Sequence, residues 1–166
     1  ILQEDNVVRC APTSPSRPWV SSVDLPGRGT TAVWQCAGPP HAETLVLLHG
    51  VAMTAELCWF RVLEQLGRQF RIVAPDLRGH GDSGWSPGGV YTLERFAADL
   101  HCIAASCRQA PVVIGASLGG ITGLLAEGEG PAILAALVLV DVTPTVQHSG
   151  VEKIREFMGA QAEEGF

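Results

Sequence analysis

The feature that most constrains this 166-residue chain is a short apolar run at residues 112–114 that ends directly in Gly-Ala-Ser-Leu-Gly-Gly at 115–120. A Gly-x-Ser-x-Gly pattern is common by itself, but here a strand-like run precedes it and a small-residue helical pattern follows it. That order predicts a sharp strand-turn-helix corner with Ser117 at its tip. Gly115 and Gly119 are expected because a Cβ at either position would meet the opposite side of the turn. A serine hydroxyl is a weak nucleophile, and such a corner presents it to a base and to backbone amides.

Apolar segments recur along the chain before and after this corner. Continuous apolar runs are typical of strands covered on both faces, and they occupy residues 45–48, 71–74, 112–114 and 137–140. Helical patterns lie between them, at residues 59–66, 93–107 and 118–127. Two alternating stretches, 19–24 and 30–36, predict a β-hairpin at the start. The alternation of strands and helices predicts an α/β fold with a mostly parallel sheet.

The predicted helix at residues 93–107 carries the clearest apolar stripe. Thr92 directly precedes it and is expected to cap its N-terminus. Tyr91 and Phe96 are spaced to form a hydrophobic contact across the first turn. These features predict a well-defined start for this helix.

Composition limits the partners and the compartment. The formal net charge is −6 and no basic stripe is visible, which argues against nucleic acid or an anionic membrane surface as a partner. The apolar runs are shorter than a membrane span, and no secretory signal is expected. The cysteines lack Cys-x-x-Cys spacing and lie mostly in apolar segments, so we expect free thiols in a reducing, cytoplasmic setting. They stand at Cys10, Cys36, Cys58, Cys102 and Cys107.

Two other site classes are rejected on context. Residues 79–84 fit the Gly-x-Gly-x-x-Gly pattern of dinucleotide-binding loops, and Asp99 lies at a plausible distance for a ribose contact. However, no helix pattern follows the glycines, and Asp99 falls inside a predicted helix. The chain has no Gly-x-x-x-x-Gly-Lys-Ser/Thr loop, and its histidines lack metal-ligand spacing. We therefore expect neither a cofactor nor a metal.

Four motifs in order carry a family resemblance. They are Leu-Leu-His-Gly at 47–50, Ala-Pro-Asp-Leu-Arg-Gly-His-Gly-Asp-Ser at 74–83, Gly-Ala-Ser-Leu-Gly-Gly at 115–120, and Leu-Val-Leu-Val-Asp at 137–141. Together they resemble the N-terminal half of the α/β-hydrolase superfamily, over residues 19–144. The resemblance implies a mostly parallel sheet with an antiparallel second strand. About six of the eight strands would be present, and the C-terminal strands would be missing.

The resemblance also implies roles for individual residues. Ser117 takes the position of the nucleophile, and the backbone amides of Leu118 and Val51 take those of the oxyanion hole. His49 belongs to the loop that carries Val51 and is interpreted as a buried structural histidine. Asp141 is placed to be the acid of the triad, because some relatives supply the acid directly after the sixth strand; a structural or capping role stays open.

A second group of polar residues is interpreted as structural, and the base is missing. A turn-stabilising cluster is expected from Asp76, Arg78, His80 and Asp82. The family's base histidine follows a later strand, whereas the single histidine after Ser117 is His148. The polar stretch around His148 makes it a poor candidate for the base.

The domain prediction follows from these positions. Residues 1–18 are interpreted as a leader or linker, 19–144 as the N-terminal part of the α/β-hydrolase core, and 145–166 as the start of a truncated cap domain. The exposed sixth strand at 137–140 would then favour self-association.

The predicted function is a serine-nucleophile hydrolase that acts on an ester or a similar small acyl substrate, present here as a fragment. The alternative is a non-catalytic, ligand-binding use of the same fold. The identity of the substrate and the activity of this chain by itself stay open.

Overall fold

The computed structural model describes residues 18–128 and 131–142, and the structural statements below concern these residues. The strands are β1 (Trp19–Leu25), β2 (Gly29–Cys36), β3 (Thr44–Leu48), β4 (Arg71–Pro75), β5 (Val112–Ala116) and β6 (Ala136–Val140). The helices are α1 (Ala55–Leu66), α2 (Leu93–Ala105) and α3 (Leu118–Gly128), with a short 3₁₀ turn at Pro87–Gly89. Every strand and helix expected from the sequence pattern is found.

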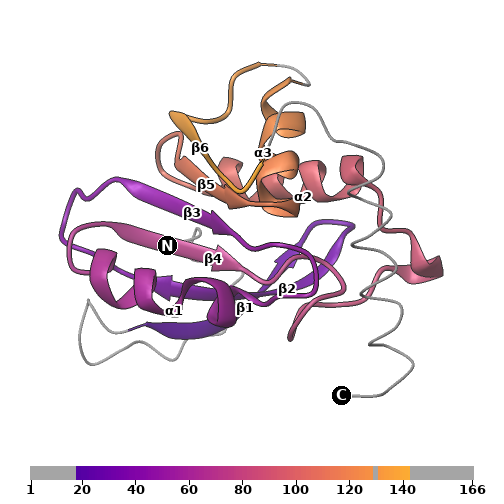
Figure 1. Ribbon diagram of the computed structural model, residues 1–166, viewed down its shortest axis with the longest axis horizontal. Helices are drawn as coiled ribbons and strands as arrows, with labels where there is room; N and C mark the ends of the chain where they lie inside the picture. Colours follow the sequence, from indigo (N-terminus) through magenta and orange to yellow (C-terminus); the bar gives the residue numbers. More distant parts are fainter. Residues whose placement is uncertain (1–17, 129–130, 143–166) are drawn as a thin grey trace.

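The described strands form one sheet in the order β1-β2-β4-β3-β5-β6. β2 runs antiparallel to both β1 and β4, whereas β3, β4, β5 and β6 pair in parallel. The fold class is therefore confirmed: this is a mostly parallel α/β sheet whose second strand is antiparallel. In Figure 1 the β1–β2 hairpin lies at one edge of the sheet and β6 at the other.

Helices cover both faces of the sheet, as the continuous apolar runs predicted. Successive residues of β3 point to opposite faces, so Leu45 and Leu47 pack with α1 while Val46 and Leu48 pack with α2. Figure 1 shows α1 on one side of the sheet and the α2–α3 pair on the other. The parallel strands are therefore held in register by two separate apolar cores.

The β6 edge is the least covered part of the described sheet. Val138, Leu139 and Val140 are each at least 40% exposed, although they are apolar. Only β5 pairs with β6 among the described residues. An apolar edge of this kind is a template for further pairing, and self-association along it remains a prediction.

The start of α2 differs from the expectation in one respect. Thr92 occupies the N-cap position with an extended backbone, but its side chain makes no capping hydrogen bond. Thr92 and the Glu94 backbone N–H lower the pKa of the Glu94 carboxyl. Tyr91 lies against Gly79, and its hydroxyl accepts the Ser86 N–H. The expected side-chain cap by Thr92 is therefore not formed.

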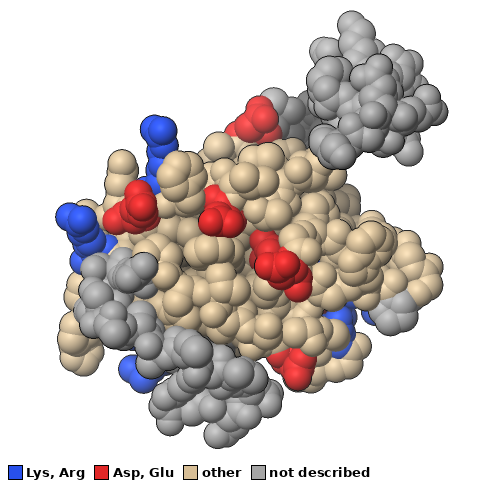
Figure 2. All heavy atoms as spheres, turned by 90° about the horizontal axis from the view of Figure 1, so that it is seen from below, with Lys and Arg blue, Asp and Glu red and all other residues tan. Residues whose placement is uncertain are grey.

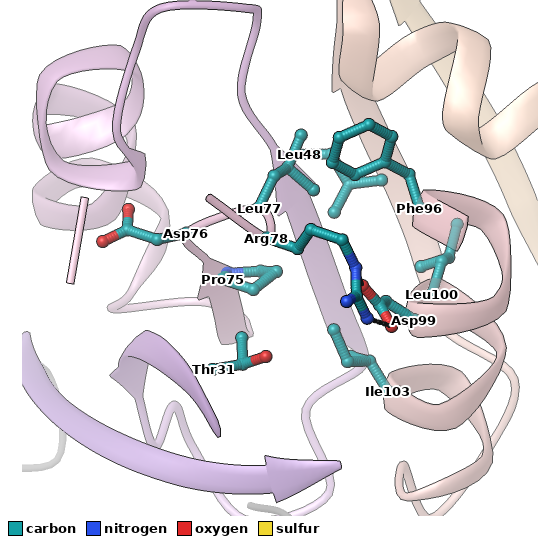
Figure 3. Close-up of a pocket in the computed structure, with 10 residues that line it drawn as sticks. All are labelled: Thr31, Leu48, Pro75, Asp76, Leu77, Arg78, Phe96, Asp99, Leu100 and Ile103. Carbon is teal, nitrogen blue, oxygen red and sulfur yellow. Dashed lines mark hydrogen bonds and ion pairs between the residues drawn. The ribbon is translucent and has the colours of Figure 1, made fainter. Parts of the chain in front are cut away.

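A buried ion network ties the first hairpin to α2. The Asp99 carboxylate accepts hydrogen bonds from Arg78, at 2.6 and 2.8 Å, and from Arg28 in the β1–β2 turn. Figure 3 shows Arg78 reaching across to Asp99 beside a small cavity of about 10 Å³ walled by Phe96 and other apolar side chains. Asp99 is therefore a structural ion-pair partner that joins the β1–β2 turn, the turn after β4 and α2.

The surface and the cysteines agree with the sequence analysis. On the face seen in Figure 2, acidic and basic side chains stand apart from one another and no basic stripe crosses it. The four described cysteines, Cys36, Cys58, Cys102 and Cys107, are free thiols. No helix among residues 18–128 and 131–142 is long and apolar enough to cross a membrane.

Candidate active site

Ser117 lies at the corner between β5 and α3, as predicted. Its φ is +46°, a left-handed conformation that non-glycine residues rarely adopt. The Ser117 N–H donates to the Val140 carbonyl at 3.0 Å, and the Ser117 carbonyl accepts the Ile121 N–H at 3.0 Å. The corner is thus fixed by β6 on one side and by the first turn of α3 on the other. Its side chain is half-buried at the carboxyl edge of the parallel strands.

The glycines around Ser117 are required by close backbone contacts. A Cβ on Gly115 would lie 2.5 Å from backbone atoms of Gly119 and Gly120. A Cβ on Gly119 would lie 2.4 Å from the carbonyl oxygen of Leu48 in β3. Both contacts are with backbone, which cannot move aside as a flexible side chain can. The sequence expectation for these positions is confirmed.

The loop after β3 passes directly beside Ser117. A Cβ on Gly50 would lie 3.5 Å from the Ser117 Cβ and 3.8 Å from the Ala116 carbonyl oxygen. Val51 follows in a turn with its side chain half exposed, and Ala52 takes a φ of +58°. The hydrogen bonds within the described residues leave the N–H groups of Val51 and Leu118 without an acceptor. These are the two amides that the sequence analysis assigned to an oxyanion hole.

His49 holds that loop and is fully buried. Its Nε2 accepts the Leu77 N–H at 2.8 Å, so its proton is on Nδ1, which donates to the Gly50 carbonyl at 2.7 Å. Burial lowers the pKa of His49, and nearby His80 lowers it further. A neutral imidazole with both nitrogens occupied has no free nitrogen to take a proton. The structural interpretation of His49 therefore fits the geometry.

Cys58 is a contact that the sequence analysis missed. It lies in α1, where burial raises the pKa of its thiol while a hydrogen bond from the Gly50 backbone lowers it. Gly50 is thus held at its carbonyl by His49, and the Cys58 thiol lies close to its backbone. The sequence signal was weak, because an isolated cysteine in an apolar helix resembles ordinary core.

Asp141 reaches the same edge of the sheet as Ser117. β5 and β6 pair in parallel with Ala116 opposite Val140, so the residues that follow them are neighbours. Asp141 is exposed and has a φ of +54°. The structure brings Ser117 and Asp141 to adjacent strand ends, which makes Asp141 available to a base near Ser117.

The polar turn after β4 is structural, as expected. The Asp76 carboxylate accepts the N–H of Ala55, the first residue of α1, at 2.7 Å and the N–H of Asp82 at 3.1 Å. The negative charge at the start of α1 also complements the helix dipole. Ser83, which was not among the residues predicted to stabilise this turn, donates to the Asp76 carbonyl at 2.6 Å.

The described residues contain no group of three or more His, Cys, Asp or Glu side chains arranged to hold a metal ion. His148 and Cys10 lie outside the described residues.

Comparisons with known proteins agree with this arrangement. The sequence model described as the alpha/beta hydrolase fold matches residues 43–164. An esterase of Mycobacterium tuberculosis is 35% identical over 125 residues, which cover 73% of this chain and 40% of the esterase. A 3-hydroxybutyrate-oligomer hydrolase of Cupriavidus necator is 28% identical over 148 residues, which cover 88% of this chain and 50% of that enzyme.

A solved structure has a similar fold. E-2-(Acetamidomethylene)succinate hydrolase superposes with a TM-score of 0.75 at 25% sequence identity, over 87% of this chain and 52% of that one. The chain therefore spans about half the length, or less, of these relatives.

The glycine contacts lead to a first prediction. Gly119→Ala would drive a Cβ into the Leu48 backbone, and we expect it to lower the free energy of unfolding by about 3 kcal/mol, the upper end for overpacking. Gly123→Ala in the same helix is the matched control, because its Cβ would meet only the flexible Leu137 side chain at 2.7 Å. Urea unfolding of both variants measures the difference. Equal stability of the two would contradict the packing argument.

Proposed function

The chain belongs to the alpha/beta hydrolase fold family, and on that premise we propose that the complete protein is a serine hydrolase that cleaves an ester or a similar acyl bond. The observation that carries the proposal is the left-handed backbone of Ser117 at the carboxyl end of β5. Backbone strain of this kind persists where the surroundings enforce it and is concentrated at functional sites. An esterase and a hydrolase among the similar proteins support the same class of reaction.

In the proposed mechanism the Ser117 Oγ attacks the carbonyl carbon of the substrate while its proton passes to a base outside the described residues, and the base then returns that proton to the leaving alcohol. The N–H groups of Val51 and Leu118 then donate to the oxyanion of the tetrahedral intermediate, which carries a full negative charge. Collapse of that intermediate expels the alcohol and leaves an acyl group on Ser117. Attack by water on the acyl-enzyme releases the acid and regenerates the serine.

The proposal assigns no base among the described residues. His49 has both ring nitrogens in hydrogen bonds. The Nδ1 of His80 contacts the Arg78 carbonyl at 3.1 Å. His41 precedes β3, at the opposite end of the parallel strands from Ser117. Asp141 is proposed as the acid that orients the base, because it follows β6 beside Ser117.

The domain boundaries and compartment are proposals of the same kind. We place a leader or linker at 1–18, the catalytic core at 19–144 and the start of a cap at 145–166, as in the sequence analysis. A cytoplasmic location is proposed because the four described cysteines are free thiols. The family match to residue 164 supports counting the last segment with the hydrolase.

The second candidate is a binding protein that holds a ligand at the carboxyl ends of the parallel strands, beside Ser117, without turnover. Its support is that no hydrogen bond within the described residues joins a histidine side chain to Ser117. The two candidates differ in one readout, because only the hydrolase consumes an ester in a Ser117-dependent reaction.

The main test is ester hydrolysis by the complete protein. With p-nitrophenyl acetate we expect Ser117→Ala to lower kcat by about 10⁶, as for the nucleophile of a well-studied serine protease. Ser106→Ala, at the C-terminal end of α2, is the control and should retain the wild-type rate. Hydrolysis that continues unchanged in Ser117→Ala would reject the proposed nucleophile.

A separate prediction concerns Asp141. Asp141→Asn removes the negative charge that stabilises a protonated base, so kcat of the complete protein should fall by about 10⁴ with little change in folding. Asp82→Asn is the matched control, since the Asp82 side chain is exposed and it is the backbone N–H of Asp82 that binds Asp76. Near-normal turnover in Asp141→Asn would place the acid elsewhere.

A further inference from the structure

A polar cavity lies at the amino-terminal ends of the parallel strands, at the opposite end of these strands from Ser117. It has a volume of about 110 Å³, and it is lined by His41, Ala42, Thr44, Arg71, Arg108 and Gln109. These residues stand just before or at the start of β3 and β4, and shortly before β5. Ser117 follows the other end of β5, so the length of a five-residue strand, about 16 Å, separates the two edges.

The cavity is lined by cationic and neutral groups. Arg71 and Arg108 carry positive charge at any physiological pH. Thr44 and Gln109 add polar atoms that can donate hydrogen bonds, and none of the six lining residues is acidic. Glu43 lies next in sequence, and its carbonyl oxygen accepts the Arg71 backbone N–H at 3.0 Å. The lining therefore suits an anion.

One guanidinium nitrogen of a lining residue has no acceptor among the described residues. Arg71 Nε is shielded from solvent, and no described group accepts a hydrogen bond from it. A buried N–H that lacks a partner is unfavourable. The described residues therefore do not use the full donor capacity of the Arg71 guanidinium.

The loop that forms one wall is held close to Arg71. Gly38 has a φ of +63°, and a Cβ there would lie 2.5 Å from the Phe70 carbonyl oxygen. The Ala42 N–H donates to the Pro39 carbonyl at 3.1 Å, which closes a turn and leaves His41 at a φ of +66°. The backbone of this wall is therefore fixed by specific contacts.

We propose that this cavity binds a phosphate group, held by the guanidinium groups of Arg71 and Arg108. Guanidinium groups match the oxygens of phosphate in both charge and geometry. At about 30 Å³ per water molecule, the volume equals that of three or four waters, enough for one phosphate group and too small for a whole nucleotide. The phosphate is either a free ion or the end of a larger ligand that extends into solvent. The site is independent of the proposed chemistry at Ser117.

Calorimetric titration of the full chain with inorganic phosphate tests the proposal, with ionic strength held constant by chloride. We expect saturable binding of one phosphate per chain. Arg71→Gln and Arg108→Gln should each raise Kd at least tenfold. Arg68→Gln is the matched control, because Arg68 is an exposed arginine of the preceding turn that does not line the cavity. Its Kd should equal that of the wild type.

Two further measurements sharpen the result. Phenyl phosphate in place of inorganic phosphate distinguishes the sources: tighter binding indicates the end of a larger ligand, and weaker binding indicates the free ion. Phosphate should also raise the Tm of the wild type and of Arg68→Gln, but not that of Arg71→Gln, which would show that the variant is folded and has lost the site. Absence of saturable binding, or an unchanged Kd in both cavity variants, would overturn the proposal.

Discussion

The tight contact of α3 with the end of β3 is the constraint on which the rest of the structure depends. Gly119 lies so close to the Leu48 backbone that no side chain fits between them. This contact brings the start of α3 beside the loop that follows β3. The pairing of β5 with β6 brings Asp141, which follows β6, beside Ser117. Ser117, Val51 and Asp141 are consequently presented at one edge by backbone geometry. The apolar cores on the two faces hold this edge rigid.

Left-handed backbone marks both ends of the sheet. The described non-glycine residues with positive φ are His41, Ala52, Ser117 and Asp141. Three of them follow β3, β5 and β6 at the carboxyl edge, where open parallel α/β sheets place their sites. The fourth, His41, lines the cationic cavity at the opposite edge. Residues with strained backbone thus lie beside both the proposed nucleophile and the proposed anion site.

Local features of the fold were predictable from sequence, and contacts between distant residues were not. The strands, helices and glycine positions around Ser117 follow from apolar runs and steric need, which neighbouring residues determine. The ion network was missed because Arg28 and Asp99 are 71 residues apart, and the sequence around either residue does not indicate which residue it pairs with. The contact of Cys58 with Gly50 was missed because an isolated cysteine in an apolar helix resembles ordinary core. The missing side-chain cap at Thr92 shows that a local pattern can also fail.

The account rests on Ser117 being a nucleophile held ready by its backbone. Reaction of the full chain with an alkoxy fluorophosphonate, followed by peptide mapping, measures this directly, because the reagent forms a stable bond with an activated serine. The account predicts one adduct per chain, on the peptide that contains Ser117, and none on the peptide that contains Ser83, whose hydroxyl is buried and donates to Asp76. Labelling elsewhere, or no labelling of a folded protein, would contradict it.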